Sequence, residues 1–354
     1  MGKALCKSTD FTTAAVPRMQ GALFPMAKRT RRRRRSWGRT FLLIVFTAAA
    51  LYAGFHCFFR PPEQKQDEVI PVSDTDTELS DQERAAAEAA AAHTRRKENF
   101  YTILVSGVDD GNGNSDTNIL LAVDVANGSI HGVSIPRDTK AVWNGKNHKI
   151  NAAYGSGGME KLADTVSDQL GIPVDYTVCV NLKGFVALVD AIGGVDFNVP
   201  IDMNYDDPYQ DLSIHFSAGM QHLNGQEALE VVRFRHNNDG TGYGSEDIGR
   251  MQTQQAFLKT VASKALTLSN IDSLIQVFFQ YVDTDLTIGN LAWLADKVLS
   301  MGTENISFST LPNEWHSPYI YLDQEATLDL VNQYLNPYEE DRLPEDLNIP
   351  SMPS

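Results

Sequence analysis

Three acidic residues stand in a turn-forming stretch between two apolar runs. The segment GVDDGNGNSDTNILLAVDV, residues 107–125, carries Asp109, Asp110 and Asp116 and no lysine. The apolar runs predict buried strands, and two adjacent strands would bring Asp109 and Asp116 to one edge of a sheet. Carboxylates that leave places for water and phosphate suit Mg²⁺ or Mn²⁺. A solvated turn explains the same residues equally well, whereas the P-loop and calcium-loop patterns are not present.

Arginines next to acids occur in a second stretch. Arg137 and Asp138 follow an apolar run that ends at Pro136, and the end of a strand is where an α/β sheet tends to hold ligands. An arginine can bind phosphate oxygens through two parallel hydrogen bonds. A local ion pair in a turn is the simpler interpretation of this dipeptide by itself.

A third stretch, VVRFRHNNDGTGYGSEDIGR at residues 231–250, contains four more charged candidates. Arg233 and Arg235 lie at the end of a predicted helix, and Asp247 and Arg250 lie in the first turns of the next one. An i,i+3 surface pair would explain Asp247 and Arg250. Taken together, the three stretches supply a cluster of carboxylates and several arginines that could neutralise a phosphate group.

The elements that must position these residues alternate between strands and helices. This alternation predicts an α/β architecture, with a central sheet covered by helices. Apolar runs and helical spacing give the following ranges: strands at 100–108, 118–126, 130–135, 174–180, 195–199 and 306–311, and helices at 158–171, 182–194, 224–235, 245–265 and 326–335, with two more helices after 269.

The N-terminal part differs sharply in charge from the rest. Residues 1–40 hold eleven Lys or Arg and one acid, although the whole chain has a formal net charge of −15. Residues 41–59 carry no formal charge and are long enough for one transmembrane helix. The basic cluster then predicts a cytoplasmic N-terminus and an extracellular C-terminal domain, on a single-pass cell-membrane protein. We favour this over a cleaved signal peptide because the apolar run continues past the Ala48–Ala50 cleavage-like site.

The remaining chain divides into three predicted parts. Residues 60–98 are an extracellular linker, polar at first and then Ala-rich, with a short helix that lifts the domain off the membrane. Residues 99–335 form the folded domain, and the Pro-rich, acidic residues 336–354 form a flexible tail. Only Cys179 lies in the outer domain, so a disulfide scaffold and a cysteine zinc site are excluded there. The acidic outer domain also argues against a nucleic-acid partner.

Several motifs in order resemble the LytR-CpsA-Psr family. They are SDTN (115–118), SIPRDT (134–139), HKINAAY (148–154), GGM (157–159), VNLKGFVALVDAIGGVDFNV (180–199), LNGQEALEVVRFRH (223–236) and EDIGRMQTQQ (246–255). The resemblance covers roughly residues 100–265. It implies a central mixed β-sheet flanked by helices, preceded by one N-terminal transmembrane helix.

The resemblance also implies a Gram-positive cell-surface phosphotransferase. Such an enzyme moves a glycopolymer, for example teichoic acid or capsular polysaccharide, from a polyprenyl-pyrophosphate carrier to peptidoglycan through a phosphodiester link. The residues at the family's motif positions would then be Asp109 and Asp116 at Mg²⁺, Asp138 and Asp247 as supporting acids, and Arg137, Arg233, Arg235 and Arg250 around the pyrophosphate. The prenyl chain would lie in an apolar tunnel, with residues 185–194 and 257–266 as its expected walls.

Two positions depart from the family pattern. Asn114 and Thr253 stand where the family usually has arginines, and Lys146 or Lys149 could supply the missing charge. Two other functions therefore remain open. One is a hydrolase of polyprenyl pyrophosphate that uses water as the acceptor, and the other is a non-catalytic protein that binds wall polymer or lipid pyrophosphate. The sequence does not specify the glycopolymer or the acceptor hydroxyl.

Overall fold

The computed structural model of the chain describes residues 59–65, 93–108, 113–209, 212–244, 246–265 and 271–353, without the side chains of residues 246–248, 271–273 and 303. Four of the expected features lie outside these residues: the basic segment 1–40, positions 41–58 of the membrane span, the Ala-rich run up to residue 92, and Asp109. Among the helices within the described ranges, none combines the length and apolarity needed to cross a bilayer.

The strands and helices follow the predicted alternation. The strands are β1 (Phe100–Val108), β2 (Ser115–Asp124), β3 (Ser129–Ile135), β4 (Lys140–Trp143), β5 (Lys146–Lys149), β6 (Tyr176–Asn181), β7 (Val195–Val199), β8 (Met203–Asp207), β9 (Leu212–Phe216), β10 (Gly219–Leu223), β11 (Val282–Thr284), β12 (Ile306–Thr310), β13 (Asn313–His316) and β14 (Tyr319–Leu322). The helices are α3 (Asn151–Leu170), α4 (Leu182–Ala191), α5 (Gly225–Arg233), α6 (Glu246–Ala265), α7 (Ile271–Tyr281), α8 (Ile288–Met301) and α9 (Gln324–Leu330), which continues into a π-helical turn, Val331–Leu335.

Six of these strands form the central sheet, in the order β11-β6-β1-β2-β3-β12. β1 pairs with β6 and β3 pairs with β12 in parallel, whereas β2 is antiparallel to both of its neighbours. The sheet is therefore mixed, as the resemblance implies. The hairpins β4–β5, β8–β9 and β13–β14 were not predicted, because their strands are four or five residues long and carry polar residues that give no clear alternation.

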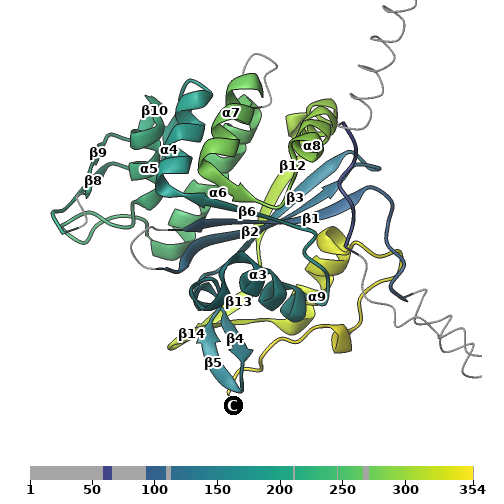
Figure 1. The fold of residues 1–354 in the computed structure, drawn as a ribbon. Helices are drawn as coiled ribbons and strands as arrows, with labels where there is room; N and C mark the ends of the chain where they lie inside the picture. The colour runs from purple at the N-terminus through teal and green to yellow at the C-terminus, as the bar shows by residue number, and fades with distance from the viewer. Residues whose placement is uncertain are drawn as a thin grey trace, which may run out of the picture. The chain divides into compact units, whose positions relative to one another are not determined.

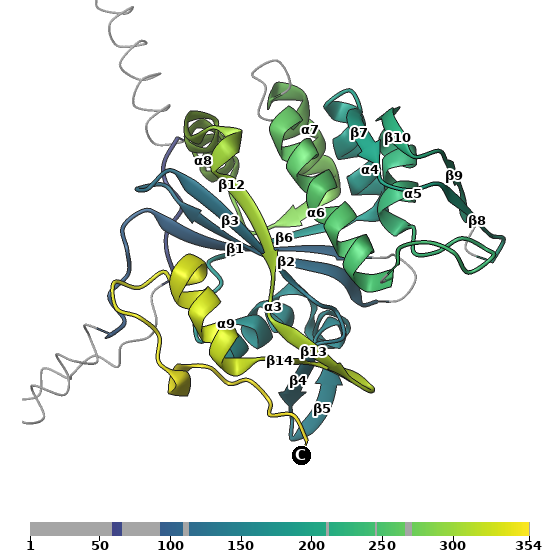
Figure 2. The same cartoon turned by 180° about the vertical axis from the view of Figure 1, so that it is seen from behind.

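Helices cover both faces of the sheet (Figures 1 and 2). One face packs against α3 and α9 through a core that includes Leu104, Leu120 and Leu162. The other face lies under α4 to α8 and packs through residues such as Ile103 and Trp293. Adjacent residues of β1 enter different cores because successive side chains of a strand point to opposite faces.

The sequence predicted that this helix begins near Gly158, whereas α3 begins at Asn151. Gly157 and Gly158 have non-helical backbone angles and interrupt it. The predicted helical periodicity therefore belongs to the part after the break, which ends as expected at Gly171, with a φ of 64°. The short first part of α3 reaches the edge of the sheet that carries the predicted site residues.

A buried ion pair joins the starts of β1 and β6. Asp175 is 2% exposed and lies directly before β6. It accepts hydrogen bonds from Arg96 Nη2 at 2.8 and 3.1 Å, from the Thr102 amide at 2.9 Å and from the Lys65 amide at 2.9 Å. The Asp175 amide in turn donates to the Thr102 carbonyl. One carboxylate thus holds the segment before β1, the strand β1 itself and the strap formed by residues 59–65.

Both ends of the predicted linker pack onto the domain. Gln64 Nε2 donates to the carbonyls of Lys97 and Phe100 at 2.8 and 2.7 Å. Arg96 Nη1 donates to the carbonyl of Lys65 at 2.7 Å, so the chain positions on either side of residues 66–92 lie next to each other. The described ends of this segment are therefore parts of the domain edge and not of a spacer that holds the domain away from residue 59.

The prediction of a flexible tail is wrong for the described residues 336–353. Tyr338 is 2% exposed and Leu347 is 6% exposed. The Arg342 guanidinium carbon lies 4.2 Å from the centroid of the Tyr338 ring, and backbone hydrogen bonds join the tail to residues 95–97. Proline and acid content suggested disorder, but Tyr338 and Leu347 of this segment are buried in the domain.

We expect Asp175→Ala to lower the free energy of unfolding of the full chain by about 3–5 kcal/mol, because it leaves the Arg96 charge buried without its partner. Denaturant unfolding followed by tryptophan fluorescence measures this change. Asp196→Ala is the matched control, because that carboxylate is 71% exposed and its loss should cost less than about 0.5 kcal/mol. Equal costs for the two variants would show that the buried pair is not an anchor.

Tyr338→Ala should lower the free energy of unfolding by about 3–5 kcal/mol, as for other large aromatic side chains removed from a core. The same denaturation experiment tests this expectation. Tyr209→Ala serves as the control, because the Tyr209 side chain is fully exposed. If the Tyr338 variant were as stable as the control, the tail would not be part of the packed domain.

Candidate functional site

The start of β2 lies at one edge of the sheet, beside the ends of β1 and β3. Ser115 pairs with Val108, and Asn118 pairs with Ile135. Arg137, just after β3, donates from Nη1 to Asp116 Oδ1 at 2.7 Å. The side chains of Arg137 and Asp116 are 33% and 45% exposed, so the pair is accessible to a ligand. We call this edge of the sheet, with the residues that surround the pair, the rim.

Unsatisfied buried polar atoms lie directly behind Asp116. Ser106 Oγ donates to Asn118 Oδ1 at 2.9 Å. Asn118 Nδ2 and Ser115 Oγ are buried and have no hydrogen-bond partner among the described residues. Such atoms are rare in folded proteins, and a bound water or ion commonly satisfies them. Asp116 lies at a register irregularity of the β1–β2 pair, where Gly107 is opposite Thr117 and Val108 is opposite Ser115, and Asn118 follows it two positions further along β2.

The first part of α3 closes this side of the rim. A Cβ atom at Gly155 would lie 2.6 Å from the Gly113 carbonyl oxygen and 3.2 Å from Asn114 Oδ1. Glycine therefore allows the helix to approach the β1–β2 connection closely. Asn114 is half-buried in this contact and takes part in the packing between the connection and α3.

Two aromatic side chains, Phe234 and Tyr243, pack between the segments that carry the arginines of the third stretch. Arg233 and Arg235 flank Phe234, which is fully buried at the end of α5. The Tyr243 ring packs edge-on against Phe234, with their centroids 5.7 Å apart. Burial raises the pKa of the Tyr243 hydroxyl, and the neighbouring Thr253 hydroxyl and Arg250 charge oppose that shift. Tyr243 therefore packs between Phe234 at the end of α5 and Gly249 of α6, one position before Arg250.

Helix α6 is tied both to α5 and to the sheet. Gln254 Nε2 donates to the Val232 carbonyl at 3.0 Å, next to Arg233. Gln255 Nε2 donates to Thr310 Oγ1 at 2.9 Å, at the end of β12. Gln254 also lines a small cavity together with Thr117 of β2 and Ser134 of β3. These contacts place the first turns of α6 over the strands that carry Asp116 and Arg137.

A glycine allows the close approach of Tyr243 to α6. A Cβ atom at Gly249 would lie 2.5 Å from the Tyr243 Cβ atom. Thr253, one turn further along, is 5% exposed and donates from Oγ1 to the Gly249 carbonyl at 2.9 Å. Thr253 is therefore buried against Tyr243, and a neutral hydroxyl suits that environment better than an unpaired guanidinium.

The remaining predicted residues divide into four cases. Asp138 forms an ion pair with Lys149 at 3.0 Å, so Lys149 is held at the rim by its own partner. Lys146 lies opposite Trp143 at the tip of the β4–β5 hairpin. Asp247 belongs to the first turn of α6, but its side chain is not among those described. Asp109 lies outside the described residues.

The expected tunnel walls pack as core in this structure. Phe257 is 1% exposed, and its ring centroid lies 5.8 Å from that of Phe185 and 5.4 Å from that of Phe197. The small cavity under α6 lies beside this core, with Ile119, Leu258 and Phe308 among its lining residues. The apolar side chains at this position lie next to the rim.

Two residues of the rim were not identified from the sequence. Asn118 is part of the SDTN motif, but no role was predicted for it. The available signal was that a polar residue stands at the start of a buried apolar run, two positions after Asp116. Tyr243 stood in a Gly- and Asn-rich loop, and no pattern indicated that it would pack on Phe234. Within the described residues, no group of three or more His, Cys, Asp or Glu side chains is placed to hold a metal ion.

The fold and the rim define an α/β protein with an exposed carboxylate–guanidinium pair and further arginines nearby, a class of site that suits an anionic phosphate ligand. The model of the LytR_cpsA_psr family matches residues 69–336, and the chain belongs to that family.

Relatives of known structure or function agree with this assignment. The chain is 35% identical over 245 residues to the polyisoprenyl-teichoic acid–peptidoglycan teichoic acid transferase TagU of Bacillus cereus, covering 66% of this chain and 77% of the relative. The crystal structure of Bacillus subtilis TagV superposes with a TM-score of 0.57 at 27% identity, over 68% of this chain and 98% of that one. The Lin1025 protein of Listeria innocua superposes with a TM-score of 0.53 at 28% identity, over the same shares.

We expect Arg137→Ala to change the free energy of unfolding by less than about 1 kcal/mol, because exposed ion pairs contribute little to stability. Denaturant unfolding of the full chain tests this. A decrease of several kcal/mol in the free energy of unfolding would contradict this expectation. It would indicate that the Asp116–Arg137 pair stabilises the fold and is not primarily a ligand-binding group.

Proposed function

We propose that this protein is a membrane-anchored phosphotransferase that moves a glycopolymer of the teichoic acid or capsular type from a polyprenyl-pyrophosphate carrier to peptidoglycan. The observation that carries the proposal is the accessible Asp116–Arg137 pair at the rim. In this proposal Arg250 of α6 and the arginines at the end of α5 complete the site, and the packing of Tyr243 between Phe234 and α6 supports this. Family membership and the transferase named among its relatives support the same activity.

The reaction replaces one bond to phosphorus by another. The acceptor hydroxyl oxygen of peptidoglycan attacks the phosphorus that carries the glycopolymer. The bond from that phosphorus to the bridging oxygen breaks, and polyprenyl phosphate leaves. The proton of the hydroxyl passes to a carboxylate of the rim. Phosphoryl transfer of this kind depends mainly on positioning and charge neutralisation, which Arg137, Arg233, Arg235 and Arg250 provide in this proposal.

A magnesium ion fits the chemistry of the rim. Mg²⁺ is commonly bound by one or two carboxylates together with phosphate oxygens and water, and the Asp116 carboxylate is 45% exposed. Asp116 and Asp109 would hold the ion, with Mn²⁺ as an alternative. When bound, the ion would neutralise charge on the pyrophosphate. Asp138 and Asp247 are proposed as supporting acids.

Membrane anchoring follows from residues 41–59 and the basic cluster before them. In this proposal the N-terminus is cytoplasmic, and the domain that includes the described residues 93–353 is extracellular. The prenyl chain of the carrier would enter between α6 and the sheet, where apolar residues lie beside the rim.

Hydrolysis of the pyrophosphate is the second candidate function. The accessible rim admits water as an acceptor, and the same arginines would stabilise its transition state. Asn114 and Thr253 reduce the positive charge relative to the family pattern, and a protein that only binds lipid pyrophosphate or wall polymer would tolerate that loss. The products distinguish the three functions: a phosphodiester on peptidoglycan, free phosphorylated glycopolymer, or unchanged substrate.

We expect Arg137→Ala to reduce glycopolymer transfer by about 10²–10³-fold, the cost of removing one group that stabilises transition-state charge. The measurement is transfer of labelled polyprenyl-pyrophosphate glycan to peptidoglycan by the full chain in detergent, with Mg²⁺ and with EDTA. Transfer should be lost in EDTA and return when Mg²⁺ is added.

Arg95→Ala is the matched control, because that side chain is 66% exposed and paired with Glu339 at the domain edge. It should transfer at the wild-type rate. Equal activity of the Arg137 and Arg95 variants would contradict the role of the rim, and activity in EDTA would contradict the role of the metal.

A further inference from the structure

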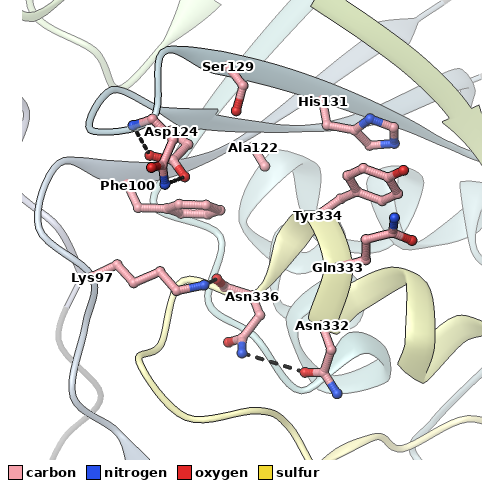
Figure 3. Close-up of a pocket in the computed structure, with 11 residues that line it drawn as sticks. Lys97, Phe100, Ala122, Asp124, Ser129, His131, Asn332, Gln333, Tyr334 and Asn336 are labelled. Carbon is pink, nitrogen blue, oxygen red and sulfur yellow. Dashed lines mark hydrogen bonds between the residues drawn. The ribbon is translucent and has the colours of Figure 1, made fainter.

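A second hollow lies on the face of the sheet that packs against α3 and α9, at the opposite end of β2 from Asp116. It has a volume of about 210 Å³ and is bounded by β1, β2, β3 and the π-helical turn after α9 (Figure 3). Asp116 and Asp124 are eight positions apart on β2, which corresponds to about 26 Å. The Leu104–Leu120–Leu162 core lies on this face between them, so the hollow is separate from the rim. We call it the π-turn pocket.

The walls of the π-turn pocket combine aromatic rings with neutral polar groups. Phe100 and Ala122 are buried in its floor, whereas Tyr334 is 39% exposed at its mouth. Gln333, Asn127 and Ser129 are also exposed there. Amide and hydroxyl groups offer both donors and acceptors. A ligand with many hydroxyl groups needs this mixture, together with an apolar surface for its carbon skeleton.

Tyr334 is held in position before any ligand arrives. Its ring stacks on His131 with a centroid distance of 3.9 Å and an interplanar angle of 10°, as Figure 3 shows. His131 is fixed in turn by Ser307 Oγ at Nδ1, 2.7 Å away, and by Ser309 Oγ at Nε2, 2.8 Å away. A preorganised ring costs little entropy when a ligand binds against it.

The charges of the pocket do not favour an anion. Among the described residues that line it, Lys97 supplies the one formal positive charge and Asp124 the one carboxylate. Lys97 Nζ already donates to the Asn336 carbonyl at 2.9 Å, and Asp124 accepts from the Asn127 amide groups. A volume below the roughly 300 Å³ of pockets for drug-sized ligands suits a single ring.

We propose that the π-turn pocket binds one sugar ring of a glycan. Such a pocket would hold the protein on a wall polysaccharide while the rim, about 26 Å away along β2, works on another part of the same or a neighbouring chain. The gain comes from effective concentration, since a weak second contact makes the first one partly intramolecular. The choice of a wall glycan as the ligand rests on the proposed function, whereas the saccharide chemistry of the pocket does not.

The test is saturation-transfer NMR on the full chain in detergent, without substrate for transfer. The probes are a tetramer of β-1,4-linked N-acetylglucosamine, which represents the peptidoglycan backbone, a neutral glucose tetramer, which represents a hexose-containing polymer, and inorganic phosphate. We expect saccharide binding in the millimolar range. Gln333→Ala and Tyr334→Ala should each weaken it by about tenfold, the equivalent of one or two lost hydrogen bonds or a lost ring contact.

Three variants serve as controls. Tyr209→Ala removes a fully exposed tyrosine elsewhere and should bind like wild type. Asp196→Ala removes an exposed carboxylate outside the pocket and should also bind like wild type. Tyr334→Phe keeps the stacked ring and should lose less affinity than Tyr334→Ala, which separates the hydroxyl from the ring. Denaturant unfolding of each variant shows that it remains folded.

Several outcomes would overturn the proposal: no saccharide binding by the wild type, equal binding by wild type and both pocket variants, or phosphate binding that those variants remove. Saccharide binding is measured without turnover. The binding experiment therefore tests the pocket independently of the transfer assay, and either proposal can be contradicted without the other.

Discussion

The buried Asp175–Arg96 pair is the interaction on which the position of the rim depends. It anchors the starts of β1 and β6, which run in parallel from Ile103 opposite Tyr176 to Val108 opposite Asn181. Because parallel strands rise equally per residue, fixing their starts also fixes where they end. β2 begins beside the end of β1. The position of the Asp116 carboxylate therefore depends on a charge pair at the other end of the sheet.

The antiparallel course of β2 gives the two ends of one strand different chemical roles. Asn118 lies on the α3 side at the rim, and Ala122 and Asp124 lie on the same side in the π-turn pocket. Thr117 and Ile119 face α6. A register shift of one residue would exchange these faces, and the burial of Leu120 at 0% exposure resists such a shift. The same alternation that builds the core therefore places the polar groups.

The sequence predicted those elements that have strong periodicity. The three first strands of the sheet, the capped helix α5 and the long helix α6 all follow apolar patterns that burial on one or two faces requires. Charged candidates at the ends of these elements, Asp116 and Arg137, are indeed brought together. The hairpins β4–β5 and β13–β14 and the packed segment after Asn336 were missed, because short polar strands and proline-rich segments carry weak local signals.

By itself, the sequence determined the alternation of strands and helices, the family and the residue types at the rim, since these depend on local pattern and on motifs in order. Only the tertiary structure decided which charges meet. It paired Asp116 with Arg137 and Asp138 with Lys149, buried Thr253 against Tyr243 and left Asn118 Nδ2 without a partner among the described residues. Contacts between residues far apart in the chain depend on strand order and helix packing, which no local pattern specifies.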